Sequence, residues 1–438
     1  GYDVANSCRF NVAYLNIDVT ASSATSWTIS FWIKIHSHSA SAEGYLWSCG
    51  SGSAGQGFYI SATSFLGYYG GSGYGSDSSV SNGVLRDPAA WYHVVFKVSS
   101  GTGTTYVNGI QQAGTVSSVA PLNAHTGDEM TVNTYTADKA GYDDCLCSLA
   151  EYCFIDGTAY SASDFGEFDE DSPTIWKPKD VSGLTFGTNG FYLDFEASDN
   201  LGNDANGGTD WTETNLAATD QASDSPTNNF ATLNPLANEL TMTEGGLSVA
   251  YVSQDKNTGA TMGVKNGKWY WEVKDVGGKS SFGIANSANR IGVTDQSSAA
   301  GMYLVQSTGA DNWSQYTSGS FASTSVGVQS ANDILNFALD CDNGKLYLGI
   351  NGSFVNSSNA SADPAAASNP FFSSISTDEF LIPFVEMRTS GGDADFNFGN
   401  PSYANSSDAA DANGYGAFEY APPSGFYALC TKNLAEYG

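Results

Sequence analysis

Apolar residues recur at every second position along much of this chain, and no stretch keeps the 3.6-residue spacing of a helix. In SWTISFWIKI, Trp27, Ile29, Phe31 and Ile33 fall on one face, and AWYHVVFKV repeats the pattern. This alternation is typical of a β-strand that packs one face on a core. The sequence therefore predicts an all-β protein built from half-buried strands.

Two Asn-Gly pairs mark places where such strands turn back. TTYVNG ends in Asn108-Gly109, and the segment KLYLGING ends in Asn351-Gly352. A type I′ turn needs a positive φ at both central residues, which Asn and Gly tolerate best. Each pair therefore predicts a two-residue hairpin loop.

The polar surface is built mainly from Ser, Thr, Asn, Gly and carboxylates. Charged residues make up 14% of the 438 residues, 49 residues are glycine, and the net charge is −30. Nucleic-acid phosphates and anionic lipids require clustered Lys and Arg, so the charge argues against both partners. The chain has no apolar run of about 18 residues, so we expect no membrane insertion. The polar start GYDVANSCRF predicts no signal peptide.

Seven cysteines are an odd number, so they cannot all pair within one chain. Cys145, Cys147 and Cys153 cluster in DDCLCSLAEYC, without the spacing and fourth ligand of a zinc site. We expect free thiols that serve as small apolar core residues. Free thiols favour assembly in a reducing cytoplasm.

The C-terminal half resembles a SPRY domain. The motifs that carry the resemblance lie within residues 239–402 and are, in order, GKWYWEV, FGIA, DILNFALDCDNGKLYLGINGSF and PFVEMRTSGGDADFNFG. The resemblance implies a bent antiparallel β-sandwich that binds partners through loops at one end and carries no catalytic apparatus.

Residues 1–165 resemble the laminin-G-like, concanavalin-A-like sandwich. The carriers are WTISFWIKI, GFYI, WYHVVFKVSSGTGTTYVNG and LCSLAEYCFIDGTAYSASDFG. The resemblance implies a curved jelly roll that binds glycans or proteins, often with a calcium ion at its rim. The expected fold is therefore two antiparallel β-sandwiches joined by an extended connector over residues 166–238 and followed by a C-terminal tail over residues 403–438.

Segments outside the sandwiches are similar to structural proteins of tailed bacteriophages. The carriers are IWKPK, GTNGFYLDF, DWTETNLAATDQASDSPTNNFATLNPL and the terminal GFYALCTKNL. This similarity implies a protein of the virion surface, as a tail fibre, spike or capsid-decorating subunit, that assembles in the host cytoplasm. The implied partners are other virion subunits, further copies of the same chain and a glycan of the host surface.

Aromatic side chains in loop-like sequence are the candidates for glycan contacts, because their rings stack on the C–H faces of sugars. Tyr68, Tyr69 and Tyr74 lie in FLGYYGGSGYG, and Trp313 and Tyr316 lie in DNWSQY. The alternative is that these rings pack on the sandwich rim or against a neighbouring subunit.

The loop DNLGNDANGGTD is the candidate metal site. Asp199, Asn203, Asp204, Asn206 and Asp210 offer hard oxygen ligands on a flexible loop, which suits Ca²⁺, although the spacing is not that of an EF-hand. The alternative is a solvated loop whose Asx side chains cap its own backbone. No cofactor is required, and calcium is the one that this loop would take.

Three carboxylates in GEFDEDS raise the question of an enzyme. Glu167, Asp169 and Asp171 stand at alternate positions, as in some laminarinase-type glycosidases of the same architecture. The stretch runs into Ser-Pro and lacks the apolar alternation of a strand that lines a cleft. A solvated acidic loop is the simpler interpretation, so we assign no catalytic residue and expect no enzyme.

The four histidines give no further site. His36 and His38 stand two positions apart and could share a metal, but only His93 and His125 accompany them and no HExxH motif is present. We interpret them as strand-end, loop or structural residues.

Together these features predict non-covalent adhesion to a host glycan by a protein of the virion surface. Two alternatives stay open: an architectural cement protein without a ligand, and a polysaccharide-degrading enzyme on the jelly roll.

Overall fold

The computed structural model describes residues 1–37, 44–50, 55–70, 78–81, 83–122, 127–136, 139, 145–237, 240–277, 280–287, 300–306, 313–327, 330–388 and 390–438. They form two compact units, residues 1–227 (unit 1) and residues 228–438 (unit 2). Both are built almost entirely from antiparallel strands, which confirms the predicted fold class. No helix in the described ranges is long and apolar enough to cross a membrane.

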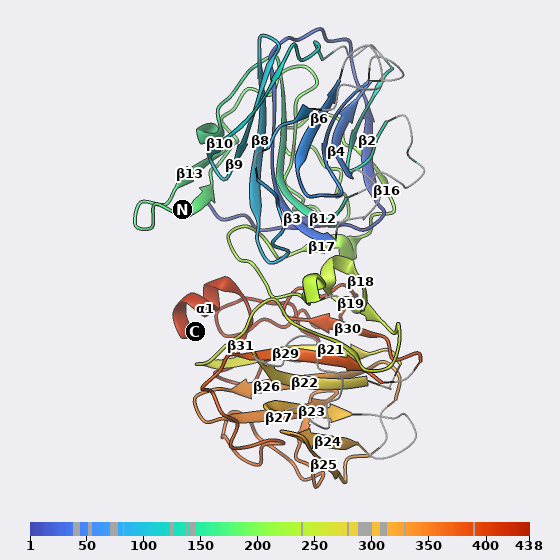
Figure 1. Cartoon of the computed structure of the whole chain (residues 1–438), viewed down its shortest axis with the longest axis vertical. Coiled ribbons are helices and arrows are strands. Elements are labelled where there is room, and N and C mark those ends of the chain that lie inside the picture. Colours follow the sequence, from blue (N-terminus) through green and yellow to red (C-terminus); the bar gives the residue numbers. More distant parts are fainter. Residues whose placement is uncertain are drawn as a thin grey trace. The chain divides into compact units, whose positions relative to one another are not determined.

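Unit 1 contains two large sheets (Figure 1). Sheet 1A has the order β10-β9-β8-β3-β12-β1-β17, with β15 also paired to β12, and sheet 1B has the order β16-β2-β11-β4-β5-β6-β7. The strands of sheet 1A are β1 Ser7–Phe10, β3 Trp27–Ser37, β8 Tyr92–Ser99, β9 Thr102–Val107, β10 Ile110–Ser117, β12 Leu146–Asp156, β15 Phe191–Leu193 and β17 Gln221–Ala222. The strands of sheet 1B are β2 Tyr14–Asp18, β4 Gly44–Cys49, β5 Gln56–Ile60, β6 Leu66–Gly70, β7 Ser78–Ser79, β11 Glu129–Val132 and β16 Thr212–Thr214. Smaller elements of unit 1 are η2 Ala162–Asp164, β13 Gly166–Phe168, β14 Trp176–Pro178 and η3 Ala218–Asp220.

The apolar faces of sheets 1A and 1B pack together as the core of unit 1. Trp27 of β3 meets Trp47 of β4 with ring centroids 5.1 Å apart, and Phe31 of β3 meets Phe58 of β5 at 6.4 Å. The predicted inner face of β3 is fully buried. Aromatic pairs of this kind contribute packing energy beyond their buried area.

The second face of β3 is also buried, which the expectation of half-buried strands missed. Thr28, Ser30, Trp32 and Lys34 are at most 3% exposed. The cause is the segment after β12, which returns over the outer face of sheet 1A. This segment includes most of the expected connector: β15, β16 and β17 pair with β12, β2 and β1. Residues 166–227 therefore belong to the first sandwich.

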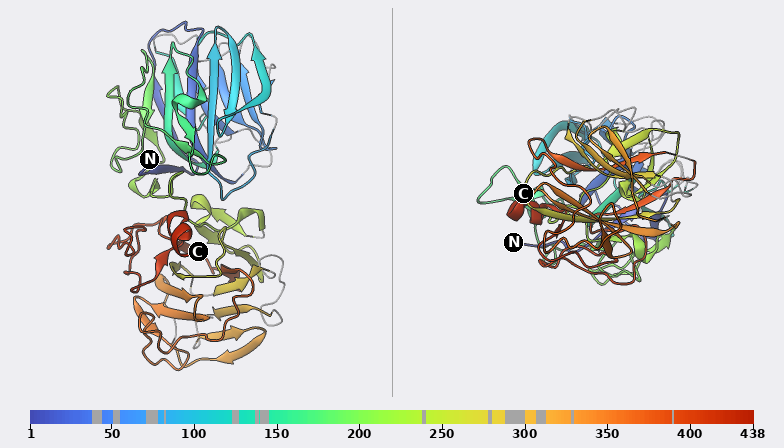
Figure 2. Two further views of the ribbon diagram at one scale, coloured as in Figure 1. Left: turned by 90° about the vertical axis from the view of Figure 1, so that its left-hand side faces the viewer. Right: turned by 90° about the horizontal axis from the view of Figure 1, so that it is seen from below.

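Unit 2 is a second sandwich, seen from two further directions in Figure 2. Sheet 2A has the order β18-β19-β30-β21-β26-β27-β28, with β31 also paired to β21, and sheet 2B has the order β20-β29-β22-β23-β24-β25. The strands of sheet 2A are β18 Thr241–Thr243, β19 Ser248–Ala250, β21 Lys268–Asp275, β26 Asp333–Asp340, β27 Lys345–Ile350, β28 Ser353–Val355, β30 Ala394–Asn397 and β31 Tyr427–Ala428. The strands of sheet 2B are β20 Lys256–Gly259, β22 Ser280–Asn286, β23 Met302–Gln306, β24 Ser314–Thr317, β25 Ser320–Ser323 and β29 Leu381–Met387. The remaining elements are η4 Pro235–Ala237, η5 Glu244–Gly246 and α1 Thr431–Tyr437.

The expected C-terminal tail is an integral part of unit 2. β31 pairs with β21, and Phe418 and Phe426 pack with Tyr270 and Tyr347 on the outer face of sheet 2A. The tail covers that face, so residues 403–438 complete the sandwich rather than extend from it.

The hairpin and cysteine predictions are confirmed. Asn108 and Gly109 join β9 to β10 with φ values of 47° and 75°, and Asn351 and Gly352 join β27 to β28 with φ values of 47° and 80°. Both hairpins have two-residue loops with positive φ, as a type I′ turn requires. All seven cysteines are free and buried.

Candidate functional site

Tyr68 and Tyr69, expected as exposed loop residues, lie on β6 and are only 1% and 4% exposed. The ring of Tyr68 packs near Trp27 at a centroid distance of 6.4 Å, and its hydroxyl donates to Gln56 Oε1 at 3.2 Å. The expectation of exposed glycan platforms is wrong for these two residues, because LGYYG pairs with QGFYI as a strand. Tyr74 lies outside the described residues.

Trp313 and Tyr316 are also core residues. Trp313 is fully buried within unit 2, and Tyr316 on β24 is 8% exposed and packs with Met302 and Leu304. Strand pairing continues on both sides of β24, which turns a loop-like sequence into sheet. The expectation of exposed rings is therefore wrong here too.

The Asp/Asn-rich loop is held together by its own side chains. Asp204 Oδ1 accepts hydrogen bonds from the backbone N–H groups of Tyr192 and Asn206 at 2.9 and 3.0 Å. Asp210 Oδ1 accepts from the N–H of Asp204 at 3.2 Å, and its Oδ2 accepts from Asn200 Nδ2 at 2.8 Å. These bonds are those of the self-capping alternative. Asp199 is exposed at the edge of the loop.

The described part of the chain holds no group of three or more His, Cys, Asp or Glu residues arranged to bind a metal. Asp204 is 5% exposed, and burial raises the pKa of its carboxyl against the lowering effect of its hydrogen bonds. Its role in the loop is therefore to organise the backbone.

The carboxylates of GEFDEDS lie on the β13–β14 hairpin. Glu167 stands opposite Lys177, whose Nζ lies 3.6 Å from Glu167 Oε1 and 3.3 Å from Asp169 Oδ2. Asp169 Oδ1 also accepts from the N–H groups of Asp171 and Ser172, and these bonds with Lys177 hold its pKa below the usual range. A glycosidase acid needs a raised pKa and a cleft. This hairpin matches the solvated acidic loop.

Two histidines form buried pairs with serine. His36 Nε2 lies 2.8 Å from Ser148 Oγ, and His93 Nε2 lies 2.9 Å from Ser30 Oγ. Trp176 Nε1 donates to His93 Nδ1 at 2.9 Å, so the neutral ring carries its proton on Nε2 and donates it to Ser30. His93 therefore cannot accept the Ser30 proton as a general base. His38 and His125 lie outside the described residues.

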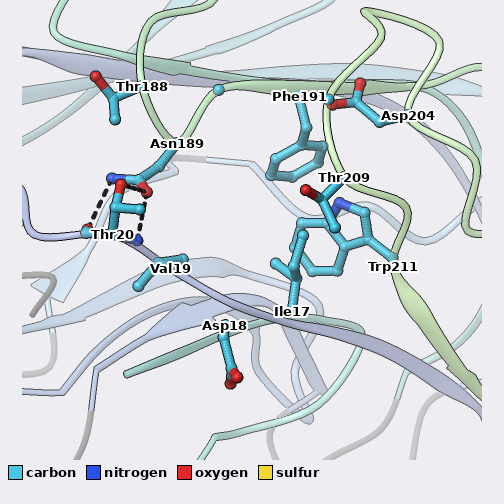
Figure 3. A pocket seen from close by; sticks show the side chains of 12 residues that line it. Ile17, Asp18, Val19, Thr20, Thr188, Asn189, Phe191, Asp204, Thr209 and Trp211 are labelled. Carbon is cyan, nitrogen blue, oxygen red and sulfur yellow. Dashed lines mark hydrogen bonds between the residues drawn. The ribbon is translucent and has the colours of Figure 1, made fainter. Parts of the chain in front are cut away.

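The described residues of unit 1 form a pocket of about 140 Å³ where the end of β2 meets the segment before and after β15. Figure 3 shows Phe191, Trp211 and Ile17 on one side of it and Asn189 and Thr20 on the other. The pocket is lined by Ile17, Asp18, Val19, Thr20, Thr188, Asn189, Gly190, Phe191, Asp204, Gly208, Thr209 and Trp211.

An edge-to-face aromatic pair forms the floor of the pocket. The ring centroids of Phe191 and Trp211 lie 4.5 Å apart at 64°, and each residue is 3% exposed. The backbone N–H of Trp211 donates to Gly202 O at 2.8 Å, and a Cβ at Gly202 would stand 2.3 Å from Trp211 O. Gly202 is therefore needed for the close approach that places Trp211 against Phe191.

Asn189 fixes the opposite wall. Its Oδ1 accepts from both the N–H and the hydroxyl of Thr20 at 2.9 Å. Its Nδ2 donates to Thr20 O at 3.2 Å and to Asp156 Oδ2 at 2.9 Å. These bonds tie the end of β2 to the loop before β15, so the pocket is preformed.

Sequence reasoning missed Trp211 and Phe191 as site residues. Trp211 follows Asp210 in DWTET, and an isolated Trp beside a polar Asp/Asn/Gly loop was the signal available. Phe191 was placed on a strand, but only the fold brings that strand beside Trp211.

Comparisons with known proteins agree with the geometry of unit 1. The profile of the Concanavalin A-like lectin/glucanases superfamily matches residues 11–143. No curated protein matches the chain.

Solved structures similar to parts of the chain include both sandwich types. A heptameric SAP-like pentraxin from Limulus polyphemus is 17% identical, with a TM-score of 0.30, over 37% of this chain and 80% of that one. A candidate carbohydrate-binding protein from Bacteroides ovatus is 17% identical, with a TM-score of 0.37, over 49% and 59%. The SPRY domain of human HERC1 is 17% identical, with a TM-score of 0.30, over 37% and 96%. The likeness is one of fold.

Proposed function

We propose that this protein is a subunit of a phage virion surface that adheres non-covalently to a host glycan through the Trp211 pocket. The observation that carries the proposal is the pocket itself, which combines an aromatic and apolar floor with a few hydrogen-bonding groups. Ligand sites are typically concave, largely apolar and preformed, with a small number of placed polar groups. The superfamily matched by residues 11–143 includes lectins, which supports a glycan as the ligand.

The virion location rests on the similarity of GTNGFYLDF, DWTETNLAATDQASDSPTNNFATLNPL and GFYALCTKNL to tailed-phage structural proteins. These segments supply β15, β16 and β17 of unit 1 and β31 of unit 2, so they are part of the folded units. As a closed homo-oligomer, the protein would present several copies of a weak site and bind by avidity.

The proposed adhesion involves no hydrolysis and requires no cofactor. Glycoside hydrolysis uses two carboxyl groups that face each other across the scissile bond. Asp204 is committed to backbone N–H groups, and the side chain of Asp18 points away from Phe191 and Trp211 in Figure 3. The pocket therefore offers a binding surface without an opposed acid and nucleophile.

A glycan array probed with the full chain tests the adhesion. We expect binding to host-surface glycans that Trp211→Ala reduces at least tenfold, while Phe321→Ala, which removes an exposed ring of unit 2, leaves it unchanged. No signal from the wild-type protein would favour the cement protein, and release of shortened glycan would favour the enzyme. Antibody labelling of intact particles tests the virion location, which absence of label would contradict.

A further inference from the structure

We infer that the Trp211 pocket binds one neutral, hydroxylated sugar ring at the end of a glycan chain. This inference rests on the proposed function and narrows its ligand class. It follows from three properties of the pocket: its size, its charge and its hydrogen-bonding groups that lack partners.

The size of the pocket fits a single ring. Its volume is about 140 Å³, and a protein cavity of roughly 150 Å³ holds one six-membered benzene ring. Sites for larger ligands measure roughly 300–1,000 Å³. The pocket therefore accepts a terminal residue, while the rest of a glycan remains outside it.

The charge of the pocket opposes anionic ligands. Its lining includes the carboxylates Asp18 and Asp204 and no Lys, Arg or His among the described residues. A uronic acid, sialic acid, sulfate or phosphate group would bring a like charge near these carboxylates without a compensating cation. The net charge of −30 acts in the same direction.

The hydrogen-bonding groups without partners require a ligand with oxygen acceptors. The indole Nε1–H of Trp211 is buried and has no partner among the described residues. Such a group costs roughly 1–3 kcal/mol when it is left unpaired, and it can only donate. A sugar hydroxyl or ring oxygen accepts this bond, whereas an alkyl or ammonium group cannot.

Two threonines extend the same argument to the rim. Thr188 and Thr209 are exposed, line the pocket and use no side-chain hydrogen bond within the described residues. Their hydroxyls can donate or accept, which matches the dual character of sugar hydroxyls. The amide of Asn189, in contrast, is committed to Thr20 and Asp156, so it shapes the pocket without contacting the ligand.

Titration of the full chain with methyl glycosides, followed by saturation-transfer NMR, tests the inference. The probes are a neutral set (glucoside, galactoside, N-acetylglucosaminide), an anionic set (glucuronide, sialoside) and a cationic glucosaminide. Trp211→Phe keeps a ring and removes the N–H, and Thr209→Val keeps the shape and removes a hydroxyl. Thr212→Val, on exposed β16 outside the pocket, is the matched control.

We expect at least one neutral glycoside to bind more tightly than every charged probe. Trp211→Phe should weaken that binding about tenfold and Thr209→Val about threefold, with no change for Thr212→Val. Preference for a charged probe would overturn the inference. So would glycan-array binding that neither pocket variant alters, although adhesion itself would then stand. Absence of all glycan binding would overturn both the adhesion proposal and this inference.

Discussion

The two units cover the outer face of one sheet by the same route but hold the covering segment with different chemistry. In unit 1, residues 157–227 return over sheet 1A, where Val95 and Ile155 pack with Phe165 and Phe186. In unit 2, the last residues of the chain return over sheet 2A, where Tyr270 and Tyr347 pack with Phe418 and Phe426. In both cases a strand predicted to be half-buried becomes buried on both faces.

Unit 1 secures its covering segment with a buried ion pair. Lys34 Nζ lies 2.7 Å from Asp224 Oδ2, with the side chains 0% and 2% exposed, and Trp91 Nε1 donates to Asp224 Oδ1 at 3.1 Å. The charge of Asp224 is thus balanced by a cation on the sheet that the segment covers.

Unit 2 instead uses a buried carboxylate that receives several hydrogen bonds. Glu272 is fully buried; its Oε2 accepts from the N–H of Glu419 at 2.9 Å, and its Oε1 accepts from the N–H of Tyr420 at 2.8 Å and from the Tyr270 hydroxyl at 2.9 Å. Burial raises the pKa of this carboxyl, while the N–H donors lower it. Removing a partner should therefore be costly in both units, but most costly where a bare charge is left behind.

Lys34→Met should give the largest effect. It leaves Asp224 buried without its cation, and we expect the free energy of unfolding of unit 1 to fall by about 3–5 kcal/mol. Urea unfolding with pulsed hydrogen exchange reports the two units separately. Lys177→Met, which breaks the exposed pairs on the β13–β14 hairpin, should leave stability nearly unchanged. Equal effects of the two substitutions would show that the buried pair carries no special weight.

Glu272→Gln should be the next largest. One oxygen becomes an NH₂ group that faces N–H donors, so we expect unit 2 to lose about 3 kcal/mol. In the same pulsed-exchange measurement, unit 1 should not change. The exposed Glu436 gives the control, because Glu436→Gln removes a charge from α1 without touching the buried face. A loss in unit 2 no larger than that of the control would contradict the role given to Glu272.

The sequence predicted the strands of both sandwiches well because a two-residue period and Asn-Gly turns are local signals. Trp27, Ile29, Phe31 and Ile33 are fully buried as expected, and both predicted hairpins are present. These features depend on neighbours within a few residues, so the chain states them directly.

The candidate site was not predictable by the same means. Tyr68 appeared exposed because its surroundings are rich in Gly and Ser, but pairing with β5 buries it. Phe191 and Trp211 meet only because β15 joins sheet 1A while β16 joins sheet 1B. Such contacts arise from tertiary pairing of short strands, which a polar sequence between them does not announce.

Glu151→Gln should reverse the sign of the comparison, because it removes a charge that unit 1 holds poorly. Glu151 is 6% exposed on β12 and accepts from the hydroxyls of Tyr2 and Tyr192 at 3.1 and 2.8 Å. Asp194 and Glu196 add like charge nearby, but burial is the main cause that raises its pKa from 4.5 to about 7. The folded state therefore keeps a proton that the unfolded state loses, and stability falls as pH rises from about 4.5 to about 7.

The variant should abolish that loss. At pH 8 it should be more stable than the wild type, relative to the same comparison at pH 4, by up to about 3 kcal/mol. Burial lowers the pKa of His36 and His93, which makes stability fall below about pH 6.5 in both proteins. The measurement is therefore the difference between variant and wild type at each pH. A difference that does not change with pH would contradict the raised pKa.

Trp176→Phe should give the smallest effect and tests how the β13–β14 hairpin is attached. The substitution removes the indole N–H that donates to His93 Nδ1 and leaves that buried acceptor unpaired, which should cost about 1–2 kcal/mol. Because the hairpin is bound mainly through this contact and the stacking of Trp176 on His93 at 5.9 Å, the loss should appear as faster hydrogen exchange in residues 166–178. Phe168→Leu changes the hairpin's outer ring and leaves the bond to His93 intact, so it should exchange like the wild type. Faster exchange spread evenly over unit 1 would instead mean that the hairpin unfolds only with the whole sandwich.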